Sequence, residues 1–399
     1  MAEKIIVENL YKIFGSHTDK ALKLYQEGFS KDDIMEKTHQ TIGIADVSFS
    51  VNEGEILVIM GLSGSGKSTL VRCINRLIEP SYGKIYLDDV DVTALSTEDL
   101  RKLRQERFGM VFQNFALFPH RTVLKNVEYG LEIQNVSPSV REEKAMRALE
   151  QVGLKGWEKS SPGQLSGGMQ QRVGLARALA LDPDIMLMDE AFSALDPLIR
   201  RDMQDELLDL QERMQKTIIF ISHDLDEALK LGDRIILMKD GVIVQKGTAE
   251  DILTNPADDY VAKFVEDVDL SKVITAETVM KNPIEIASFS NDGPKAALRK
   301  MKTAGISSIF VQHKGKLQGL VTADNAVQAL KEGVKDLSGI LQKDIVTVSP
   351  DTQASDLLPL LAESSPVAVV NAEGKLKGVI VKGTLLAALS EGVSNNGTT

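Results

Sequence analysis

The 399-residue chain contains a single cysteine, Cys73, and a single tryptophan. One cysteine cannot form an intrachain disulfide, and it excludes a zinc site built from several thiolates. No stretch approaches the roughly 18 consecutive apolar residues that a membrane-spanning helix needs, and the first residues lack the long apolar region of a secretory signal peptide. We therefore expect a cytosolic protein that only a partner would hold at a membrane.

Basic side chains are fewer than acidic ones, 46 against 57, which gives a net charge of -11. This surplus of acid argues against a non-specific nucleic-acid binder, whose affinity comes from neutralising phosphates. The surplus lies in the first 276 residues, because residues 277–399 hold 13 basic and 12 acidic side chains. Since one domain usually takes about 100–200 residues, the chain is predicted to contain two differently charged parts.

A complete P-loop follows an apolar, strand-like run at residues 55–60 and precedes a helical pattern. In this context successive backbone N–H groups and the helix dipole point at the phosphate oxygens of a nucleotide. Lys67 is expected to reach the β- and γ-phosphates, and the hydroxyl of Ser68 to bind Mg²⁺. The predicted phosphate-binding residues are Gly61, Ser63, Gly64, Gly66, Lys67, Ser68 and Thr69.

The segment Leu-Ser-Gly-Gly-Met-Gln-Gln at residues 165–171 is the second strong motif. Together with the P-loop it resembles the ABC-type ATPases over about residues 4–265. The resemblance implies an α/β fold with a mixed sheet and a helical subdomain at about residues 112–180, with ATP and Mg²⁺ as cofactors. It also implies a head-to-tail dimer of two copies, in which each copy caps the other's nucleotide in trans through Ser166, Gly167, Gly168 and Asp196.

The same resemblance assigns roles to residues that follow apolar runs. Asp189 matches the carboxylate that holds Mg²⁺ through water, and Glu190 matches the residue that polarises the attacking water, a role worth about 10²–10⁴ in rate. Gln113 matches the glutamine that contacts Mg²⁺ and the γ-phosphate, and His223 the histidine that contacts the γ-phosphate. The implied catalytic residues are Glu190, His223, Gln113 and Lys67, and the implied metal residues are Ser68, Gln113 and Asp189.

The apolar, Pro-interrupted segment 115–120 lies where this family receives integral-membrane permease subunits, although a buried loop is the alternative interpretation. No membrane domain is fused to the ATPase, which favours an importer. Two short amphipathic pieces at residues 16–41 form an insert, and the second opens like a capping box. The insert, with segments 75–80 and 255–261, resembles the ATPase subunits of glycine betaine/proline betaine importers.

That resemblance implies a subunit on the cytoplasmic face of the membrane that drives uptake of quaternary-amine osmoprotectants. The solute would be held by a solute-binding domain elsewhere in the complex, so the insert is interpreted as a family mark and not as a binding site. Phe14 lies where the family stacks an aromatic ring on adenine, and Tyr11 is a second candidate. The alternatives are an importer for another solute, such as methionine, and a soluble regulated ATPase without a transport role.

The last part of the chain contains an internal repeat, because the sequence at 315–321 returns at 374–380, an offset of 59 residues. It resembles a tandem α/β CBS module. Thr322 with Asn325 and Val381 with Thr384 depart from the family's ribose-binding pattern, which makes ordinary adenine-nucleotide sensing doubtful.

Two regulators of this module remain open: ionic strength acting through anionic lipid, and cyclic-di-AMP. The cluster that could meet anionic lipid is Lys295, Arg299, Lys300 and Lys302, and a solvated helix face is an equally good interpretation. The predicted domains are an ATPase domain at 1–270, CBS domains at 277–335 and 338–391, and a flexible tail at 392–399.

Overall fold

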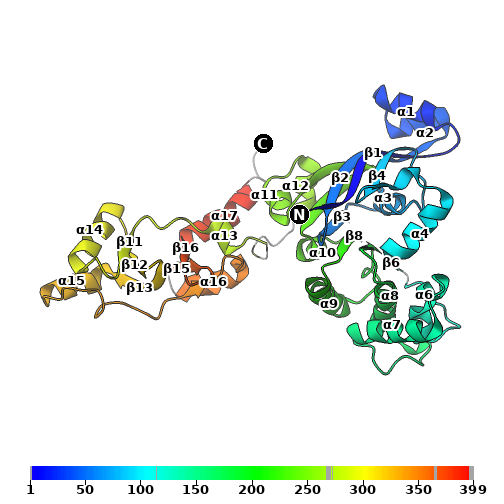
Figure 1. Ribbon diagram of the computed structural model, residues 1–399. Coiled ribbons are helices and arrows are strands. Elements are labelled where there is room, and N and C mark those ends of the chain that lie inside the picture. Colours follow the sequence, from blue (N-terminus) through cyan, green and yellow to red (C-terminus); the bar gives the residue numbers. More distant parts are fainter. Residues whose placement is uncertain (1, 114, 267–270, 272, 364–365, 395–399) are drawn as a thin grey trace. The chain divides into compact units, whose positions relative to one another are not determined.

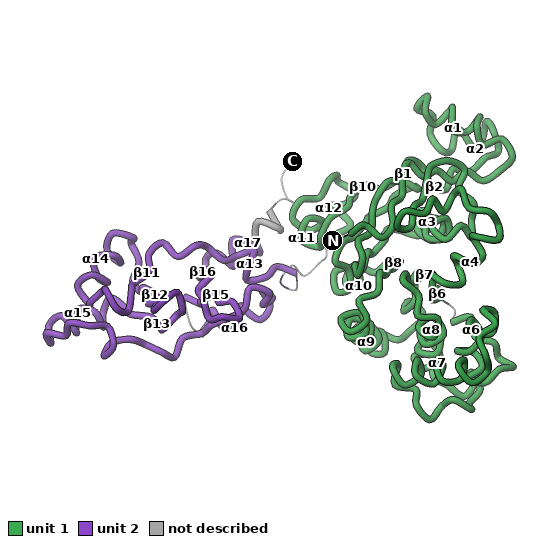
Figure 2. The backbone as a smooth tube through the Cα atoms, viewed as in Figure 1, with its two compact units in different colours: residues 1–265 green, residues 266–399 purple. Residues whose placement is uncertain are grey.

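The computed structural model describes residues 2–113, 115–266, 271, 273–363 and 366–394 of the chain. It divides into two compact units, a front unit at residues 1–265 and a tail unit at residues 266–399 (Figure 2). The predicted boundary at residue 270 lies outside the described residues.

The front unit contains an antiparallel sheet of four strands in the order β2-β1-β4-β5. Its longest strands alternate buried and exposed positions, so that Ile5, Val7 and Leu10 enter the core. This alternation is what a sheet covered on one face requires. The strands are β1 (Glu3–Phe14), β2 (Thr41–Asn52), β4 (Tyr82–Leu87) and β5 (Val90–Asp91).

A second sheet of six strands runs in the order β10-β9-β3-β8-β7-β6 and is parallel except for β10. Every residue of its three central strands is buried, which explains their unbroken apolar runs. The mixed sheets with helices confirm the predicted α/β class. The strands are β3 (Ile56–Met60), β6 (Phe108–Phe112), β7 (Ile185–Asp189), β8 (Thr217–Ser222), β9 (Arg234–Lys239) and β10 (Val242–Gly247).

Helices surround these sheets, and one group of them forms a separate lobe of the front unit (Figure 1). This helical lobe contains α5 (Val123–Val127), α6 (Tyr129–Ile133), α7 (Pro138–Gln151), η2 (Pro162–Gln164) and α8 (Gly167–Leu179). The other helices after the P-loop are α3 (Lys67–Ile74), η1 (Val92–Ala94), α4 (Thr97–Arg107), α9 (Pro197–Met214), α10 (Leu225–Leu231), α11 (Ala249–Thr254) and α12 (Asp259–Val265).

One buried side chain fixes the loop that leads into the helical lobe. Asn126 is completely buried, and its Oδ1 accepts a hydrogen bond from the backbone N–H of Phe118 at 2.7 Å. Its Nδ2 donates to the carbonyl oxygens of Phe118, Arg121 and Thr122 at 3.0–3.2 Å. A single amide therefore bonds to four backbone groups of three loop residues and holds them together.

The insert forms two helices, α1 (Thr18–Gln26) and α2 (Lys31–Thr38), beside β1 and β2 (Figure 1). Helix α2 begins with the predicted capping box, in which Ser30 and Asp33 exchange side-chain and backbone hydrogen bonds. Ala21 and Ile34 face inward and join a small core with Ile13 and Ile42. The insert thus packs on the ends of the antiparallel sheet.

The tail unit repeats one α/β arrangement, with sheets in the order β11-β12-β13 and β14-β15-β16. In each sheet the first pair of strands is parallel and the second antiparallel. The first sheet and its helices are β11 (Ile286–Ser288), α14 (Pro294–Ala304), β12 (Ser308–His313), β13 (Lys316–Thr322) and α15 (Ala323–Lys331). The second copy comprises β14 (Thr347–Val348), α16 (Ala354–Glu363), β15 (Val367–Val370), β16 (Leu376–Ile380) and α17 (Lys382–Ser394).

The two copies share an apolar contact made by Phe310, Leu320 and Ala368. Helix α13 (Ala276–Val279) precedes the first copy in sequence but packs in the core of the second. The predicted start of the first CBS domain at residue 277 therefore places this helix in the wrong copy, because long-range pairing is not visible in a local repeat. Helix α17 also extends through residues 392–394 of the predicted tail, and residues 395–399 lie outside the described part.

No helix among the described residues combines the length and the apolar character that crossing a membrane requires.

Candidate functional site

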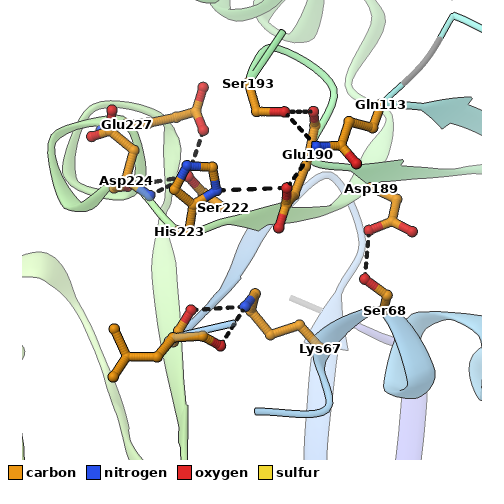
Figure 3. Close-up of polar contacts among 12 residues, drawn as sticks. Lys67, Ser68, Gln113, Asp189, Glu190, Ser193, Ser222, His223, Asp224 and Glu227 are labelled. Atoms are coloured by element: carbon orange, nitrogen blue, oxygen red, sulfur yellow. Dashed lines mark hydrogen bonds and ion pairs between the residues drawn. The ribbon is translucent and has the colours of Figure 1, made fainter. Parts of the chain in front are cut away.

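The P-loop joins the end of β3 to the start of α3, and its lysine points back into the loop (Figure 3). Lys67 is 5% exposed, and its Nζ donates to the carbonyl oxygens of Gly61 at 2.7 Å and Leu62 at 3.0 Å. Burial lowers the pKa of Lys67, while the nearby charges of Glu190 and Asp189 act to raise it. A phosphate that entered the loop would offer Lys67 an ionised acceptor in place of these neutral carbonyl oxygens.

Glycine is required at the first position of the loop. Gly61 has a φ of 143°, and a Cβ there would lie 2.1 Å from the carbonyl oxygen of Met238. Any side chain would therefore push the loop away from β9, so the close approach of the two segments depends on this glycine.

Two side chains with oxygen atoms suited to a metal ion, Ser68 and Asp189, meet at the start of α3. The hydroxyl of Ser68 donates to Oδ1 of Asp189 at 2.9 Å, and Arg72 forms an ion pair with Oδ2 of Asp189 at 3.3 Å. Hydroxyl and carboxylate oxygens are the ligands that Mg²⁺ prefers, usually completed by water and substrate phosphates. These residues therefore fit the predicted metal position beside the P-loop.

Two residues that follow separate parallel strands, Gln113 and His223, converge on the carboxylate of Glu190, which follows a third (Figure 3). Nε2 of Gln113, after β6, donates to Oε2 of Glu190 at 3.1 Å and also to the Ser193 hydroxyl at 3.1 Å. Nδ1 of His223, after β8, lies 3.6 Å from the same Oε2. Glu190 itself directly follows β7 and has a φ of 47°, so the chain turns sharply as it leaves the strand. Three of the predicted catalytic residues, Gln113, Glu190 and His223, thus lie within one network, whereas Lys67 donates its hydrogen bonds to P-loop carbonyls.

The turn that carries His223 is held by buried groups. The Ser222 hydroxyl donates to the carboxylate of Glu227, which also accepts a hydrogen bond from Gln204 at 3.1 Å. Burial raises the pKa of Glu227, and the bonds from Ser222 and Gln204 lower it in part.

A cavity of about 790 Å³ opens from the P-loop. The predicted residues Ser63, Gly64, Gly66, Lys67, Ser68, Thr69 and Glu190 line it. The rest of the wall comes from the insert, from the start of β2 and from the turn between β9 and β10. Phe14 is 41% exposed and is not among the described residues that line the cavity. Tyr11 instead packs edge-on against Tyr25 and Tyr82.

The wall contributed by the insert consists of Tyr25, Ser30, Lys31, Asp32 and Met35. No binding role was predicted for these residues from the sequence. The capping box at Ser30 signals a helix, but no local signal shows which other segment that helix covers. Their position depends on packing against β1 and β2, which only the fold provides.

The Leu-Ser-Gly-Gly-Met-Gln-Gln segment at residues 165–171 is not part of the described lining of this cavity. Ser166 caps α8 by accepting a hydrogen bond from the backbone N–H of Met169 at 3.4 Å. A Cβ at Gly168 would lie 2.6 Å from the side chain of Ile199, so a larger residue would displace α9. Ser166, Gly167, Gly168 and Asp196 are not among the described residues that line the P-loop cavity.

The structure divides the predicted basic cluster of the tail unit. Lys300 is paired within the tail unit, because its Nζ donates hydrogen bonds to Asp292 and to the carbonyl oxygen of Ile286, both at 2.9 Å. Lys295 and Arg299 line a groove of about 640 Å³ together with Lys335. At the end of β13 the Thr322 hydroxyl caps α15 by accepting a hydrogen bond from the backbone N–H of Asn325.

Comparisons with known proteins agree with this geometry. The family model for "ABC transporter" matches residues 44–193, and the model for "CBS domain" matches residues 334–391. The chain is 33% identical to the dimeric ABC transporter cassette MJ0796, with a TM-score of 0.52, and the match covers 61% of this chain and 98% of that one.

Among curated relatives, the glycine betaine/carnitine transport ATP-binding protein GbuA of Listeria monocytogenes is 55% identical over 97% of this chain and 98% of its own length. The glycine betaine transport ATP-binding protein OpuAA of Bacillus subtilis is 54% identical over 97% and 92%. The glycine betaine/proline betaine transport ATP-binding protein ProV of Salmonella typhimurium is 48% identical over the full length of both. The chain therefore belongs to the family of ABC transporter ATP-binding proteins, which couple ATP hydrolysis to transport.

Proposed function

We propose that this chain hydrolyses ATP to drive the import of glycine betaine or a related quaternary-amine osmoprotectant. The observation that carries the proposal is the 48–55% identity to three glycine betaine transport proteins over nearly the whole of both chains. The match covers 97–100% of this chain, whereas the match to the ABC cassette MJ0796 covers 61% of it. The similarity is therefore not limited to the shared ATPase motifs.

The site residues act in three groups in this proposal. The backbone N–H groups of the P-loop and Lys67 hold the phosphates, and Ser68 with Asp189 would hold Mg²⁺, which supplies charge neutralisation on the phosphates. Glu190 accepts a proton from the attacking water. Gln113 and His223, which both contact Glu190, orient that carboxylate and the water toward the γ-phosphate.

We place two copies of the chain head to tail around two ATP molecules. The position of Ser166, Gly167, Gly168 and Asp196 outside the P-loop cavity of their own chain supports a role across the dimer. A helix N-terminus such as that of α8 carries unpaired N–H groups that suit an incoming phosphate.

The permease would contact the loop that Asn126 holds. Phe118 packs against Tyr129 with ring centroids 4.6 Å apart, and the Arg121 guanidinium lies 5.0–5.5 Å from both rings. His120 is exposed beside them. An aromatic cluster with an arginine is typical of protein interfaces, and it would place the chain on the cytoplasmic face of a membrane through its partner.

The tail unit is proposed to regulate transport. The groove with Lys295, Arg299 and Lys335 offers three cations to an anionic ligand, either anionic lipid or cyclic-di-AMP. Lipid binding there would weaken as salt rises, since charges are screened over about 8 Å near physiological ionic strength. Co-sedimentation with anionic vesicles and titration with cyclic-di-AMP distinguish the two ligands, and Lys302→Glu, outside the groove, is a control of equal charge for Lys335→Glu.

The deciding experiment is uptake of labelled glycine betaine into liposomes that contain the chain, its permease subunits and internal ATP. We expect uptake that competes with carnitine, and a loss of about 10²–10⁴ in ATPase rate in Glu190→Gln, since that variant lacks the general base.

ATP hydrolysis without uptake of any quaternary amine, or stimulation by another solute such as methionine, would contradict the substrate assignment and leave the ATPase in place. Trimethylamine N-oxide belongs in the competition series, because transport ATP-binding proteins for it are 50–53% identical over 68–71% of this chain.

A further inference from the structure

We propose that Arg200 of α9 is a positioning residue that couples the two ATP sites of the dimer. It joins the loop at residues 193–196, which ends in Asp196, to the turn that carries His223. The inference rests on the head-to-tail dimer proposed above, in which Asp196 faces the nucleotide of the other copy while His223 acts on the nucleotide of its own chain.

The guanidinium of Arg200 reaches both segments at once. Its Nη1 donates to Oδ2 of Asp224 at 3.1 Å, and its Nη2 donates to the carbonyl oxygens of Ser193 and Leu195, both at 3.3 Å. The side chains of Arg200 and Asp224 are 24% and 35% exposed, so solvent screens their ion pair only in part. A planar guanidinium that serves several acceptors has little freedom to turn, which suits a rigid link.

The turn that receives this link carries His223. Asp224 follows directly, and its Oδ1 accepts a hydrogen bond from the backbone N–H of Glu227 at 3.2 Å, which caps α10. Gln204, one turn further along α9, donates to the carboxylate of Glu227 at 3.1 Å. Two side chains on one face of α9 therefore fix the turn at two points, and the turn keeps Nδ1 of His223 3.6 Å from Oε2 of Glu190 (Figure 3).

The first turn of α9 also touches the segments that are proposed to cap a nucleotide across the dimer. Ile199 packs so closely on Gly168 that a Cβ at this glycine would lie 2.6 Å from the isoleucine side chain. Leu195 lies beside Gly167, with 3.8 Å between its side chain and a Cβ built at that glycine. The start of α9 thus lies between residues 166–168 on one side and the turn after β8 on the other.

This placement lets the state of one ATP site reach the other. Closure of the dimer on the nucleotide of the other copy fixes the loop at residues 193–196, and the two carbonyl bonds then fix Arg200. The ion pair with Asp224 in turn holds His223 within reach of the γ-phosphate in its own site. Hydrolysis in one site should therefore depend on occupation of the other, which gives a Hill coefficient between about 1 and 2 for two sites.

The test measures the ATPase activity of the chain with its permease subunits in liposomes over a range of ATP concentrations. In Arg200→Gln we expect kcat to fall about 10- to 100-fold, since small misplacements near the reacting atoms cost that much, and the Hill coefficient to fall to about 1. The Kd for ATP, titrated without Mg²⁺ so that no hydrolysis occurs, should stay unchanged, because the P-loop and Lys67 hold the phosphates.

Three further variants separate positioning from a general structural role. Arg200→Lys should restore part of kcat, since a lysine can keep the ion pair but not both carbonyl bonds. Asp224→Asn, whose amide oxygen can still cap α10, should reproduce the loss and add nothing further when combined with Arg200→Gln. Arg201→Gln, at an exposed position on the same helix, is the matched control and should leave kcat and the Hill coefficient unchanged.

Four results would overturn the proposal: a Hill coefficient of 1 in the wild type, an unchanged kcat in Arg200→Gln, a rise in the Kd for ATP that equals the loss in kcat, or additive losses in the double variant. A wild-type complex that hydrolysed no ATP, or a Glu190→Gln chain that stayed monomeric with ATP, would instead refute the dimeric ATPase on which the inference rests.

Discussion

The front and tail units differ in their buried polar side chains. Among the described residues, every buried polar or charged side chain belongs to the front unit, with Lys67, Asn126, Asp189 and Glu227 as examples. The described core of the tail unit consists of apolar clusters such as the one around Leu357 and Val369. A buried polar group lowers the stability of the fold unless it is paired. In the front unit such groups include residues of the predicted site.

The burial of polar side chains indicates which kind of ligand site each unit can form. The front unit holds the predicted catalytic residues Gln113, Glu190 and His223 in one network at the ends of parallel strands, an arrangement that suits a reaction. The charges of the tail unit lie on the surface, where salt screens them. A ligand that bound there would have to displace the water around these charges. A regulatory role through surface charge is consistent with that arrangement.

The largest effect on stability is expected from the apolar core of the tail unit. Leu357 is completely buried, so Leu357→Ala should lower the free energy of unfolding of that unit by about 2–5 kcal/mol. The tryptophan and all six tyrosines lie in the front unit. The loss should therefore appear in urea melts followed by circular dichroism while the Trp157 fluorescence transition stays in place. A shift of both transitions together would show that the units do not unfold independently.

A smaller effect is expected when one polar group is removed from the front unit. Asn126→Ala should destabilise that unit by about 1–3 kcal/mol, because buried backbone groups of the loop lose their partner. The Trp157 fluorescence midpoint in urea measures it, with the exposed Glu142→Ala on α7 as control. If the loop also receives the permease, this variant should weaken stimulation of the ATPase by permease subunits more than basal hydrolysis.

The smallest effect is a dependence on pH that comes from Glu227. Burial raises its pKa above the ordinary 4.5, so the folded chain keeps this proton to a higher pH than the unfolded chain does. The free energy of unfolding should therefore fall as pH rises from 4.5 to the folded pKa, by about 1.4 kcal/mol for each unit of the shift.

Glu227→Gln should remove this part of the pH dependence. The measurement is the difference between wild type and variant in Trp157-monitored urea melts from pH 4.5 to 7. A difference that does not change over this range would mean that the folded carboxyl has its ordinary pKa.

Sequence alone could predict the elements whose chemistry restricts the residue type. Only a glycine fits the close approach at Gly61, and the capping box at Ser30 follows from local hydrogen bonds. Both features could therefore be predicted from the residue types in the sequence. The α/β class followed from the apolar runs before Gly61 and Asp189. The order of the motifs along the sequence, which resembles that of the ABC-type ATPases, was enough to predict which strands end near the phosphates.

The remaining features depend on contacts between distant segments. The hydrogen bond from Lys31 to the carbonyl oxygen of Asp240 joins residues 209 apart in the sequence, and no local pattern marks a lysine for that role. Helix α13 likewise joins the second copy of the tail unit through pairing of Thr275 with Gln353. Such placements are set by the tertiary fold, which overrides the order of segments in the chain.

The shared contact between the two copies of the tail unit makes each copy dependent on the other. Phe310 and Leu320 of the first copy are covered by Ala368 of the second, and the N–H of Leu317 donates to the carbonyl oxygen of Gly374. A shortened chain that ended after the first copy would expose this apolar face to water. The same apolar face of another molecule could cover this face most simply. Deletion of the second copy of the tail unit should therefore convert a pairing within the chain into an association between chains.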